Sequence, residues 1–144
     1  MARDDFSMSI EWENLDEMKK ALDDWEADVI RELVRAQDEN GEDLLQKSQA
    51  LAPKLDGDLE GSGTKSAVKA DPYTREISVE VGYNMVYAAR RHEEDYTPGP
   101  ITRGKPGVDG MAAGNKYLER PLIRYMSKYM QNLANAVRRT TGGG

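Results

Sequence analysis

Residues 14–53 read NLDEMKKALDDWEADVIRELVRAQDENGEDLLQKSQALAP, and they contain the strongest helix signal of the chain. Apolar side chains recur there every three or four residues, at Leu15, Met18, Leu22, Trp25, Val29, Leu33 and Ala36. Acids fill the opposite side, which is typical of a helix with one buried face, and Asn14 is well placed to cap its start. We therefore predict a long amphipathic helix.

The stripe lapses at residues 37–41 and then resumes at Leu44, Leu45, Ser48, Leu51 and Ala52. Pro53 disfavours helical geometry at the residue before it, so the helix should end there. Gly41 costs a helix interior only about 1 kcal/mol relative to alanine. We therefore predict one continuous helix with a weak point at Gly41, in preference to two helices. The lapse and the short length favour packing on a sheet over a coiled coil.

Alternating apolar and polar residues predict three strands around this helix. The first covers residues 6–12, a weaker one covers residues 64–69, and the clearest covers residues 76–81. The Asp71-Pro72 step is turn chemistry and predicts a hairpin between the last two strands. A short helix should follow within residues 84–90.

Residues 94–114 contain three prolines and five glycines but few apolar residues. A loop of this length is uncommon in a compact domain unless it has a function or is disordered, so we predict a mobile arm. Pro121 suits the first turn of a final helix. Its apolar stripe is formed by Leu122, Tyr125, Met126, Tyr129, Leu133 and Val137. Residues 140–144 should form a disordered tail.

These elements predict an α+β fold, in which the long helix and the C-terminal helix pack on a small antiparallel sheet. The 144 residues suffice for one domain covering residues 1–144. Cysteine is absent, which excludes disulfides and thiolate sites. The start of the chain lacks the apolar run of a signal peptide, and no stretch is long enough to span a bilayer. Synthesis in the cytoplasm is expected.

Charge divides the chain into two unequal halves. Residues 1–60 hold 18 acids and 7 bases, whereas residues 61–144 hold 8 acids and 13 bases. The halves could neutralise each other within one fold. Alternatively, the acidic surface of one subunit could pack against the basic surface of the next.

Two motifs suggest chemistry, and both fail on inspection. Residues 99–105 match the spacing of a phosphate-binding loop, but Pro106 stands where serine or threonine is required. His92 is the only histidine and precedes Glu93, Glu94 and Asp95. Consecutive residues project in different directions, whereas a metal site gathers ligands from separated positions. We therefore expect no catalytic residue, no metal and no cofactor.

Three short clusters resemble, in order and spacing, the minor capsid and tail-completion proteins of long-tailed phages. The first closes the long helix and turns into a strand, with Ala52, Pro53, Gly57, Leu59 and Ser62. The second ends the last strand and crosses the short helix, with Val81, Gly82, Tyr87, Ala88, His92 and Glu93. The third, Lys116-Tyr-Leu-Glu-Arg-Pro-Leu122, begins the final helix. Two features depart from the family pattern: Glu94-Asp95 stands where a glycine is usual, and the long helix contains Gly41.

The resemblance implies a structural virion protein of the neck or upper tail, a head-tail connector or tail-completion subunit. It implies a ring, a hexamer or a dodecamer, around the DNA channel, with other neck, portal-adaptor or tail proteins as partners. DNA would be passing cargo, and no membrane is involved. We expect the arm to contact a neighbouring subunit through Tyr96, Ile101, Arg103 and Met111. We expect Asp24 and Asp28 to face the channel, because a negative wall would not hold passing phosphates.

Three alternatives stay open at this point. One is a cytosolic adaptor that binds its partners through the long helix and never enters a particle. A tail terminator or tail-tube subunit shares the small α+β design and the assembly into rings. A small metal-dependent hydrolase using His92 with Glu93 or Asp95 belongs to a different class, and replacing His92 by alanine would abolish its activity.

Overall fold

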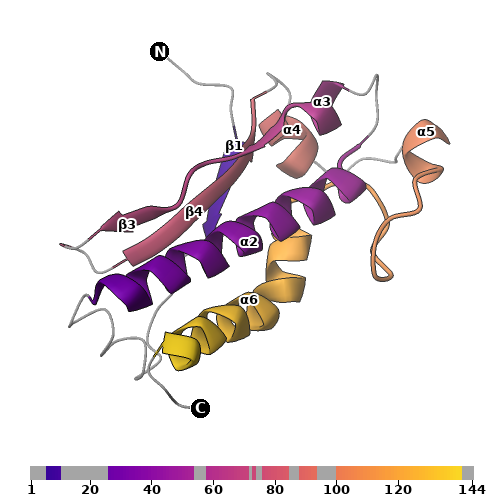
Figure 1. Cartoon of the computed structure of the whole chain (residues 1–144). Helices are drawn as coiled ribbons and strands as arrows, with labels where there is room; N and C mark the ends of the chain where they lie inside the picture. Colours follow the sequence, from indigo (N-terminus) through magenta and orange to yellow (C-terminus); the bar gives the residue numbers. More distant parts are fainter. Residues whose placement is uncertain are drawn as a thin grey trace.

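A computed structural model of the chain describes residues 6–10, 26–53, 58–71, 73, 76–84, 88–93 and 100–140. It has the predicted α+β fold, with an antiparallel sheet of four strands against two long helices (Figure 1). None of the helices in these described ranges is long and apolar enough to cross a membrane.

The central strand is β4 (Glu76–Tyr83), which pairs with all the other strands of the sheet. β1 (Phe6–Ile10) lies along one side of it, and β2 (Gly63–Lys65) and β3 (Lys69–Asp71) follow each other along the other side. The predicted alternation is confirmed, because the buried side chains of β4 occupy every second position, at Ile77, Val79, Val81 and Tyr83. These side chains form the packed face of the sheet.

A β-bulge divides the weaker predicted strand into β2 and β3. Lys65 lies opposite Val81, whereas Lys69 lies opposite Ser78, so the edge contains one extra residue. Ser66 bridges the irregularity, because its N–H donates to the Glu80 carbonyl at 2.8 Å and its hydroxyl accepts from the Glu80 N–H at 3.0 Å. Both backbone groups of Glu80 therefore keep a partner.

The long helix is α2 (Ala27–Leu51), and it runs through Gly41 without a break, as predicted. Gly41 is buried against the sheet, where an added Cβ would lie 2.9 Å from Val79 Cγ2 and 2.8 Å from Lys65 Cδ. The helix therefore approaches the central strand this closely because residue 41 has no side chain. The prediction of one helix beginning at Asn14 is wrong, because α2 begins at Ala27 and Glu26 before it has extended backbone. The predicted stripe positions at residues 15–25 lie outside the described residues.

The lapse in the apolar stripe corresponds to a polar layer inside the core. The side-chain amide of Gln37 donates to the Ile77 carbonyl of β4 at 3.1 Å. The amide of Asn40 donates to the Gln37 side chain at 3.0 Å and to the Tyr129 carbonyl at 3.1 Å. Asn132 donates back to the Asn40 side chain at 2.9 Å. These bonds tie α2 to both the sheet and the C-terminal helix, so the buried amides are satisfied.

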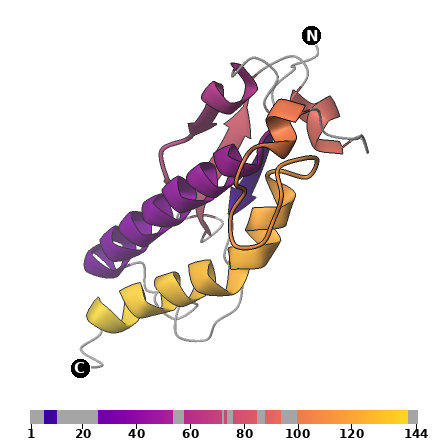
Figure 2. The same cartoon turned by 90° about the vertical axis from the view of Figure 1, so that its right-hand side faces the viewer.

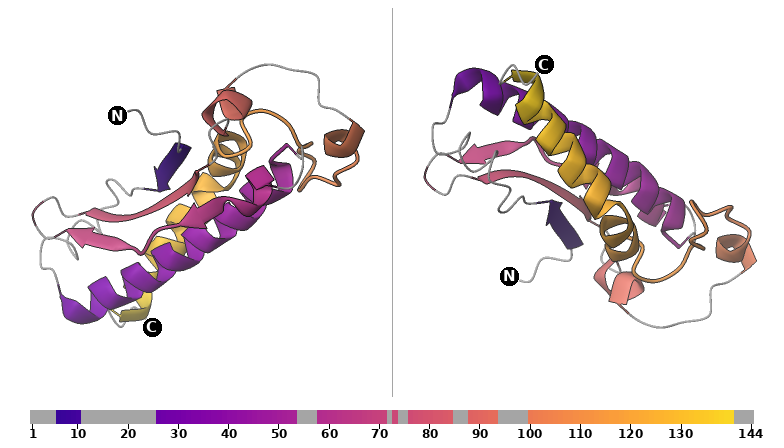
Figure 3. Two further views of the ribbon diagram at one scale, coloured as in Figure 1. Left: turned by 90° about the horizontal axis from the view of Figure 1, so that it is seen from above. Right: turned by 90° about the horizontal axis from the view of Figure 1, so that it is seen from below.

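The C-terminal helix is α6 (Glu119–Thr140), with Pro121 in its first turn as predicted. It lies beside α2, and the two helices cover the same face of the sheet (Figures 1 and 3). The helices run antiparallel, since Lys128 pairs with Asp43 at 3.7 Å and Arg139 pairs with Glu32 at 3.7 Å. Its first turns run in a different direction from the rest (Figure 2). Thr140, predicted as the start of the tail, is instead the last residue of α6, and residues 141–144 lie outside the described residues.

Two groups of buried apolar side chains make up the core. The larger lies between the C-terminal half of α2, the sheet and the start of α6, and it contains Leu44, Leu51, Ala52, Leu59, Val79, Val81, Tyr83, Ala88, Tyr117, Leu118 and Tyr129. The smaller lies between the N-terminal half of α2 and the end of α6, and it contains Val29, Leu33, Ala36, Ile77, Leu133, Ala134, Ala136 and Val137. The prediction that Met126 belongs to the buried stripe of α6 is wrong, because its side chain is 36% exposed.

Three short helices complete the described structure. They are α3 (Asp58–Gly61), α4 (Ala88–Glu93) and α5 (Pro100–Arg103). α4 corresponds to the short helix predicted after the last strand, but it covers Ala88–Glu93 and not residues 84–90. It lies next to the first turn of α6, and the segment between α5 and α6 passes the C-terminal end of α2 (Figure 2).

Candidate functional site

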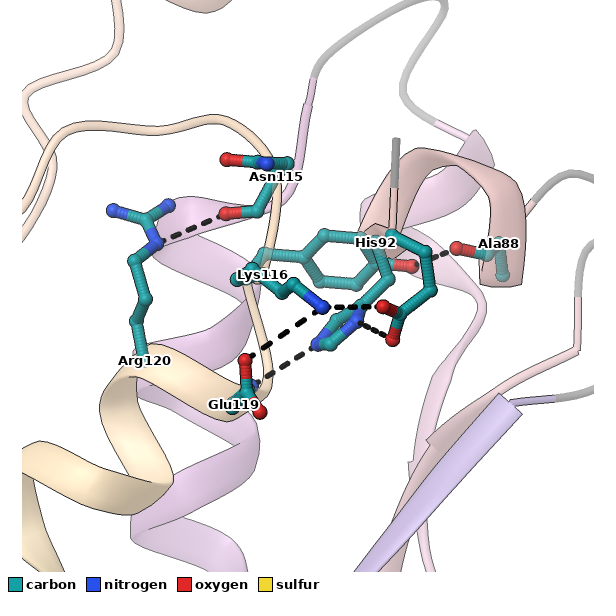
Figure 4. Close-up of polar contacts among 8 residues, drawn as sticks. Ala88, His92, Asn115, Lys116, Glu119 and Arg120 are labelled. Carbon is teal, nitrogen blue, oxygen red and sulfur yellow. Dashed lines mark hydrogen bonds and ion pairs between the residues drawn. The ribbon is translucent and has the colours of Figure 1, made fainter. Parts of the chain in front are cut away.

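The second and third sequence clusters meet at the start of α6, where His92 lies beside Lys116 and Glu119 (Figure 4). The Tyr117 hydroxyl donates to the Ala88 carbonyl of α4 at 2.7 Å. The ring packs edge-on against Tyr83, with a centroid distance of 5.1 Å, and edge-on against His92 at 5.1 Å. Ala52, at the end of α2, belongs to the same buried group. We call this region the Tyr117 junction, and it joins α2, β4, α4 and α6.

His92 uses both ring nitrogens inside the junction. Its Nε2 accepts the backbone N–H of Glu119 at 3.1 Å, so this nitrogen carries no proton. The proton is therefore on Nδ1, which lies 2.9 Å from Glu93 Oε1 and donates to it. The ring is fully buried. His92 thus satisfies an N–H at the first turn of α6, where the helix itself offers no acceptor.

Burial sets the electrostatics of His92. It lowers the pKa of the imidazole below 6.5, because desolvation penalises the charged form more than the Glu93 carboxylate favours it. A second proton on Nε2 would also face the Glu119 N–H, donor against donor. The pKa of Glu93 is lowered as well, chiefly by the hydrogen bond from the Lys116 ammonium and then by the bond from His92. The neutral histidine is the form that fits this junction.

Lys116 and Arg120 tie the segment before α6 to its neighbours (Figure 4). The Lys116 N–H donates to the His92 carbonyl at 2.7 Å, and its ammonium pairs with Glu93 and, at 3.8 Å, with Glu119. The Arg120 guanidinium donates to the Asn115 carbonyl at 2.9 Å and to the Ala112 carbonyl at 2.7 Å. Residues 112–116 are therefore held from both sides.

A second buried contact links the junction to α2. The hydroxyls of Ser48 and Tyr83 lie 2.7 Å apart in a hydrogen bond. Burial raises the pKa of the Tyr83 hydroxyl above its ordinary value, so the group stays neutral. The sequence signal for this contact is Ser48, a polar residue on the apolar stripe.

Lys105, the lysine of the apparent phosphate-binding loop, caps the end of α2. Its ammonium donates to the carbonyls of Gln49 at 2.9 Å and Ala52 at 2.7 Å, and it pairs with Glu60 at 3.1 Å. Only 11% of its side chain is exposed. These carbonyls are among those that a helix leaves without intrahelical partners. The Lys105 ammonium therefore binds the carbonyls at the end of α2 and does not face a phosphate site.

A tight hairpin follows Lys105. Val108 and Met111 exchange backbone hydrogen bonds of 3.1 and 2.8 Å around Asp109 and Gly110, which both have positive φ angles. Asp109 accepts a hydrogen bond from the Tyr125 hydroxyl of α6. Gly107 also has a positive φ, and a Cβ there would lie 2.1 Å from the Met111 carbonyl oxygen. Residues 104–111 thus lie against the C-terminal end of α2 and the N-terminal part of α6, while the mobility predicted for the arm stays a prediction.

The predicted interface residues occupy different environments. Arg103 is exposed, whereas Met111 is partly buried and packs against the core of its own chain. Ile101 belongs to α5, but its side chain lies outside the described residues, as does Tyr96. The contact with a neighbour stays a prediction.

The predicted channel-facing residues can be placed only in part. Asp28 is exposed in the first turn of α2 and pairs with Arg31 at 3.2 Å. Asp24 lies outside the described residues. The channel-facing role stays a prediction.

Ion pairs join the acidic and basic halves of the chain. Acids from the first half meet bases from the second half in Asp38–Lys65, Glu60–Lys105, Asp43–Lys128 and Glu32–Arg139. Neutralisation within one fold, the first of the two readings of the charge pattern, therefore accounts for part of the asymmetry.

The geometry offers little to the hydrolase alternative. Both nitrogens of His92 are engaged in a buried ring, and Asp95 lies outside the described residues. Within the described ranges, no three histidine, aspartate or glutamate side chains gather where they could hold a metal ion.

Comparison with protein-family models, curated proteins and solved structures finds no match for the chain. What the junction does is hold four elements in a fixed arrangement.

Proposed function

We propose that this chain is a structural subunit of the neck or upper tail of a long-tailed phage, acting by assembly into a ring around the DNA channel. The observation that carries the proposal is the set of three sequence clusters, which resemble the minor capsid and tail-completion proteins. Residues of the second and third clusters meet at the Tyr117 junction, through the contacts of Tyr117 with Ala88 and His92, and Ala52 and Leu59 of the first cluster belong to the same buried group. A shared structural role for these residues fits that arrangement.

In this role the domain works through its interfaces and has no catalytic residue. The ring would be a hexamer or a dodecamer, joined to portal-adaptor, neck or tail proteins, with DNA as passing cargo. The protein would be made in the host cytoplasm and end in the virion. Residues 94–114 would also contact the next subunit, at a cost in entropy that burial at the interface offsets. Hydrogen exchange of this segment should therefore be slower in the particle than in the free subunit.

The test is the composition of purified particles. We expect mass spectrometry of virions to detect the chain, in several copies per particle. Removing its gene should leave heads or tails that fail to join, and adding the purified protein should restore joining. Absence of the chain from infectious particles would refute the proposal. Native mass spectrometry and negative-stain imaging of the purified chain then give the number of subunits.

A further inference from the structure

Asn40 and Gly41 form the one step in the chain at which asparagine precedes glycine. Asparagine is among the thermally labile residues of proteins, because the backbone nitrogen of the next residue can attack its side-chain carbonyl carbon. Glycine has no side chain to hinder this attack, and its backbone adopts the required conformations freely in an unfolded chain. The step is therefore the position of the unfolded chain most prone to deamidation.

The reaction exchanges ammonia for water. A bond forms between the Gly41 nitrogen and Cγ of Asn40, the bond from Cγ to Nδ2 breaks, and ammonia leaves with the proton of the Gly41 N–H. The product is a cyclic imide. Water then opens the ring at either of its carbonyls, which leaves aspartate or isoaspartate at position 40. Isoaspartate has an additional methylene group in the backbone.

The folded protein keeps the two reacting groups apart. Both residues lie inside α2, where the Gly41 N–H is committed to the carbonyl four residues earlier. The Asn40 side chain is 1% exposed, and its Nδ2 donates to Gln37 at 3.0 Å and to the Tyr129 carbonyl at 3.1 Å. Its Oδ1 accepts from Asn132 at 2.9 Å. The side chain cannot turn onto its own backbone while these bonds persist.

The same bonds exclude the products. In aspartate an oxygen replaces Nδ2 and would face two acceptors, Gln37 Oε1 and the Tyr129 carbonyl oxygen. Rotation of the Gln37 amide would sacrifice its bond to the Ile77 carbonyl. A buried carboxylate in such a place is strongly destabilising. The additional methylene group of isoaspartate would also interrupt the hydrogen bonds of α2.

We propose that the Asn40–Gly41 step is a deamidation site of the unfolded chain, and that folding both stops the reaction and excludes its products. Protection is complete only when α6 has docked, because the Tyr129 carbonyl and the Asn132 amide belong to that helix. A chain that stays unfolded therefore loses its ability to fold, so the step limits the time available for folding. This inference does not depend on the proposed function.

Peptide mapping of the full chain tests the reaction. Trypsin releases residues 36–47 as one peptide, in which Asn40 is the sole asparagine, and fragment masses locate the change. At pH 8 in guanidinium chloride we expect position 40 to be converted faster than Asn132 and Asn135, which precede leucine and alanine. In native buffer the conversion should be slower by roughly 10³-fold or more, because only the unfolded fraction reacts.

Two variants separate the chemistry from the fold. In guanidinium chloride, where no fold is at stake, Gly41→Ala should slow the conversion by hindering the attack. Asn40→Asp reproduces one product and should refold poorly or melt at a much lower temperature. The matched control is Asn135→Asp at an exposed position of α6, which should refold like the original chain.

Refolding of a half-converted sample tests the exclusion directly. After dilution out of guanidinium chloride, the folded protein is separated from unfolded and aggregated chains and digested. We expect it to be strongly depleted in converted position 40. The proposal is overturned by equal conversion rates in native buffer and denaturant, or by an unchanged rate for unfolded Gly41→Ala. Folded protein with the same converted share as the starting mixture also overturns it.

Discussion

Replacing Gly41 by alanine tests the closest approach between helix and sheet. Helix propensity alone predicts that Gly41→Ala stabilises the protein by about 1 kcal/mol. The structure predicts the opposite, because the new Cβ would lie 2.9 and 3.1 Å from the two methyl carbons of Val79. Val79 is 1% exposed in the central strand and has little room to move. Lys65 can yield more easily, although its ammonium pairs with Asp38 at 2.5 Å.

The expected magnitude is the difference between these two effects. Forcing one extra methyl group into a packed core costs about 1–3 kcal/mol. After subtraction of the propensity gain, Gly41→Ala should lower the free energy of unfolding by about 1 kcal/mol, or the melting temperature by about 2–5 °C. Urea denaturation followed by circular dichroism measures it. Gly61→Ala is the matched control, since no atom lies within 4 Å of its Cβ, and its effect should stay within about 0.5 kcal/mol.

Val79→Ala provides the second arm of the experiment. On its own it should destabilise the protein by removing buried methyl groups from the core. In that background Gly41→Ala should become stabilising by up to about 1 kcal/mol, because only the flexible Lys65 side chain then has to move and the propensity gain remains. If Gly41→Ala stabilises the otherwise unchanged protein by its full helix propensity, the close approach of α2 to Val79 does not require glycine at residue 41.

Three further predictions concern the Tyr117 junction and the segment before it. The folded protein holds the pKa of His92 below 6.5, so in acid the unfolded chain binds more protons than the folded one. The stability contributed by the neutral histidine should therefore be fully present above pH 6.5. It should fall as the pH decreases below 6.5, by at most about 1.4 kcal/mol per pH unit. The His92→Gln variant should lose this part of the slope in urea denaturation measured from pH 7.5 to 5.5; an identical slope would contradict the assignment. Lys105→Met should cost about 1–3 kcal/mol, because it leaves the carbonyls of α2 and the Glu60 carboxylate without their ammonium, whereas Lys69→Met at an exposed site should be neutral. Gly107→Ala should speed hydrogen exchange in residues 104–111 far more than Gly110→Ala, because both have positive φ but only the first places a Cβ against the Met111 carbonyl; equal effects would show that φ alone decides.

The sequence predicts the elements well where periodicity is long. The α2 and α6 stripes and the alternation in β4 each repeat over several turns or residue pairs, so the α+β fold and the continuity of α2 follow from them. Met126 is the exception, because a stripe on α6 gives the direction of a side chain but not whether another element covers it.

The candidate site was harder to predict, because its partners are distant in sequence. Asn40 looks like a surface residue until Tyr129, 89 residues later, supplies the carbonyl that it binds. Lys105 has the spacing of a phosphate-loop lysine, and only the end of α2 shows where its ammonium goes. His92 carries no local sign that its Nε2 accepts the Glu119 N–H. The bulge at Ser66 leaves no sign in the sequence either, because the alternation of side chains that predicts a strand continues through it. Ser48 alone gave a hint, as a polar residue within an apolar stripe.

The pairing of β1 with β4 has a consequence for synthesis on the ribosome. Met8 lies opposite Val81, so the first strand emerges long before the strand on which it depends. α2 likewise waits for α6, because Asn40 binds the carbonyl of Tyr129 near the end of the chain. Such distant pairings slow folding and expose unpaired edges to other nascent chains. The strongly acidic first half, with 18 acids against 7 bases, would keep the emerging chains apart by mutual repulsion until the basic half arrives.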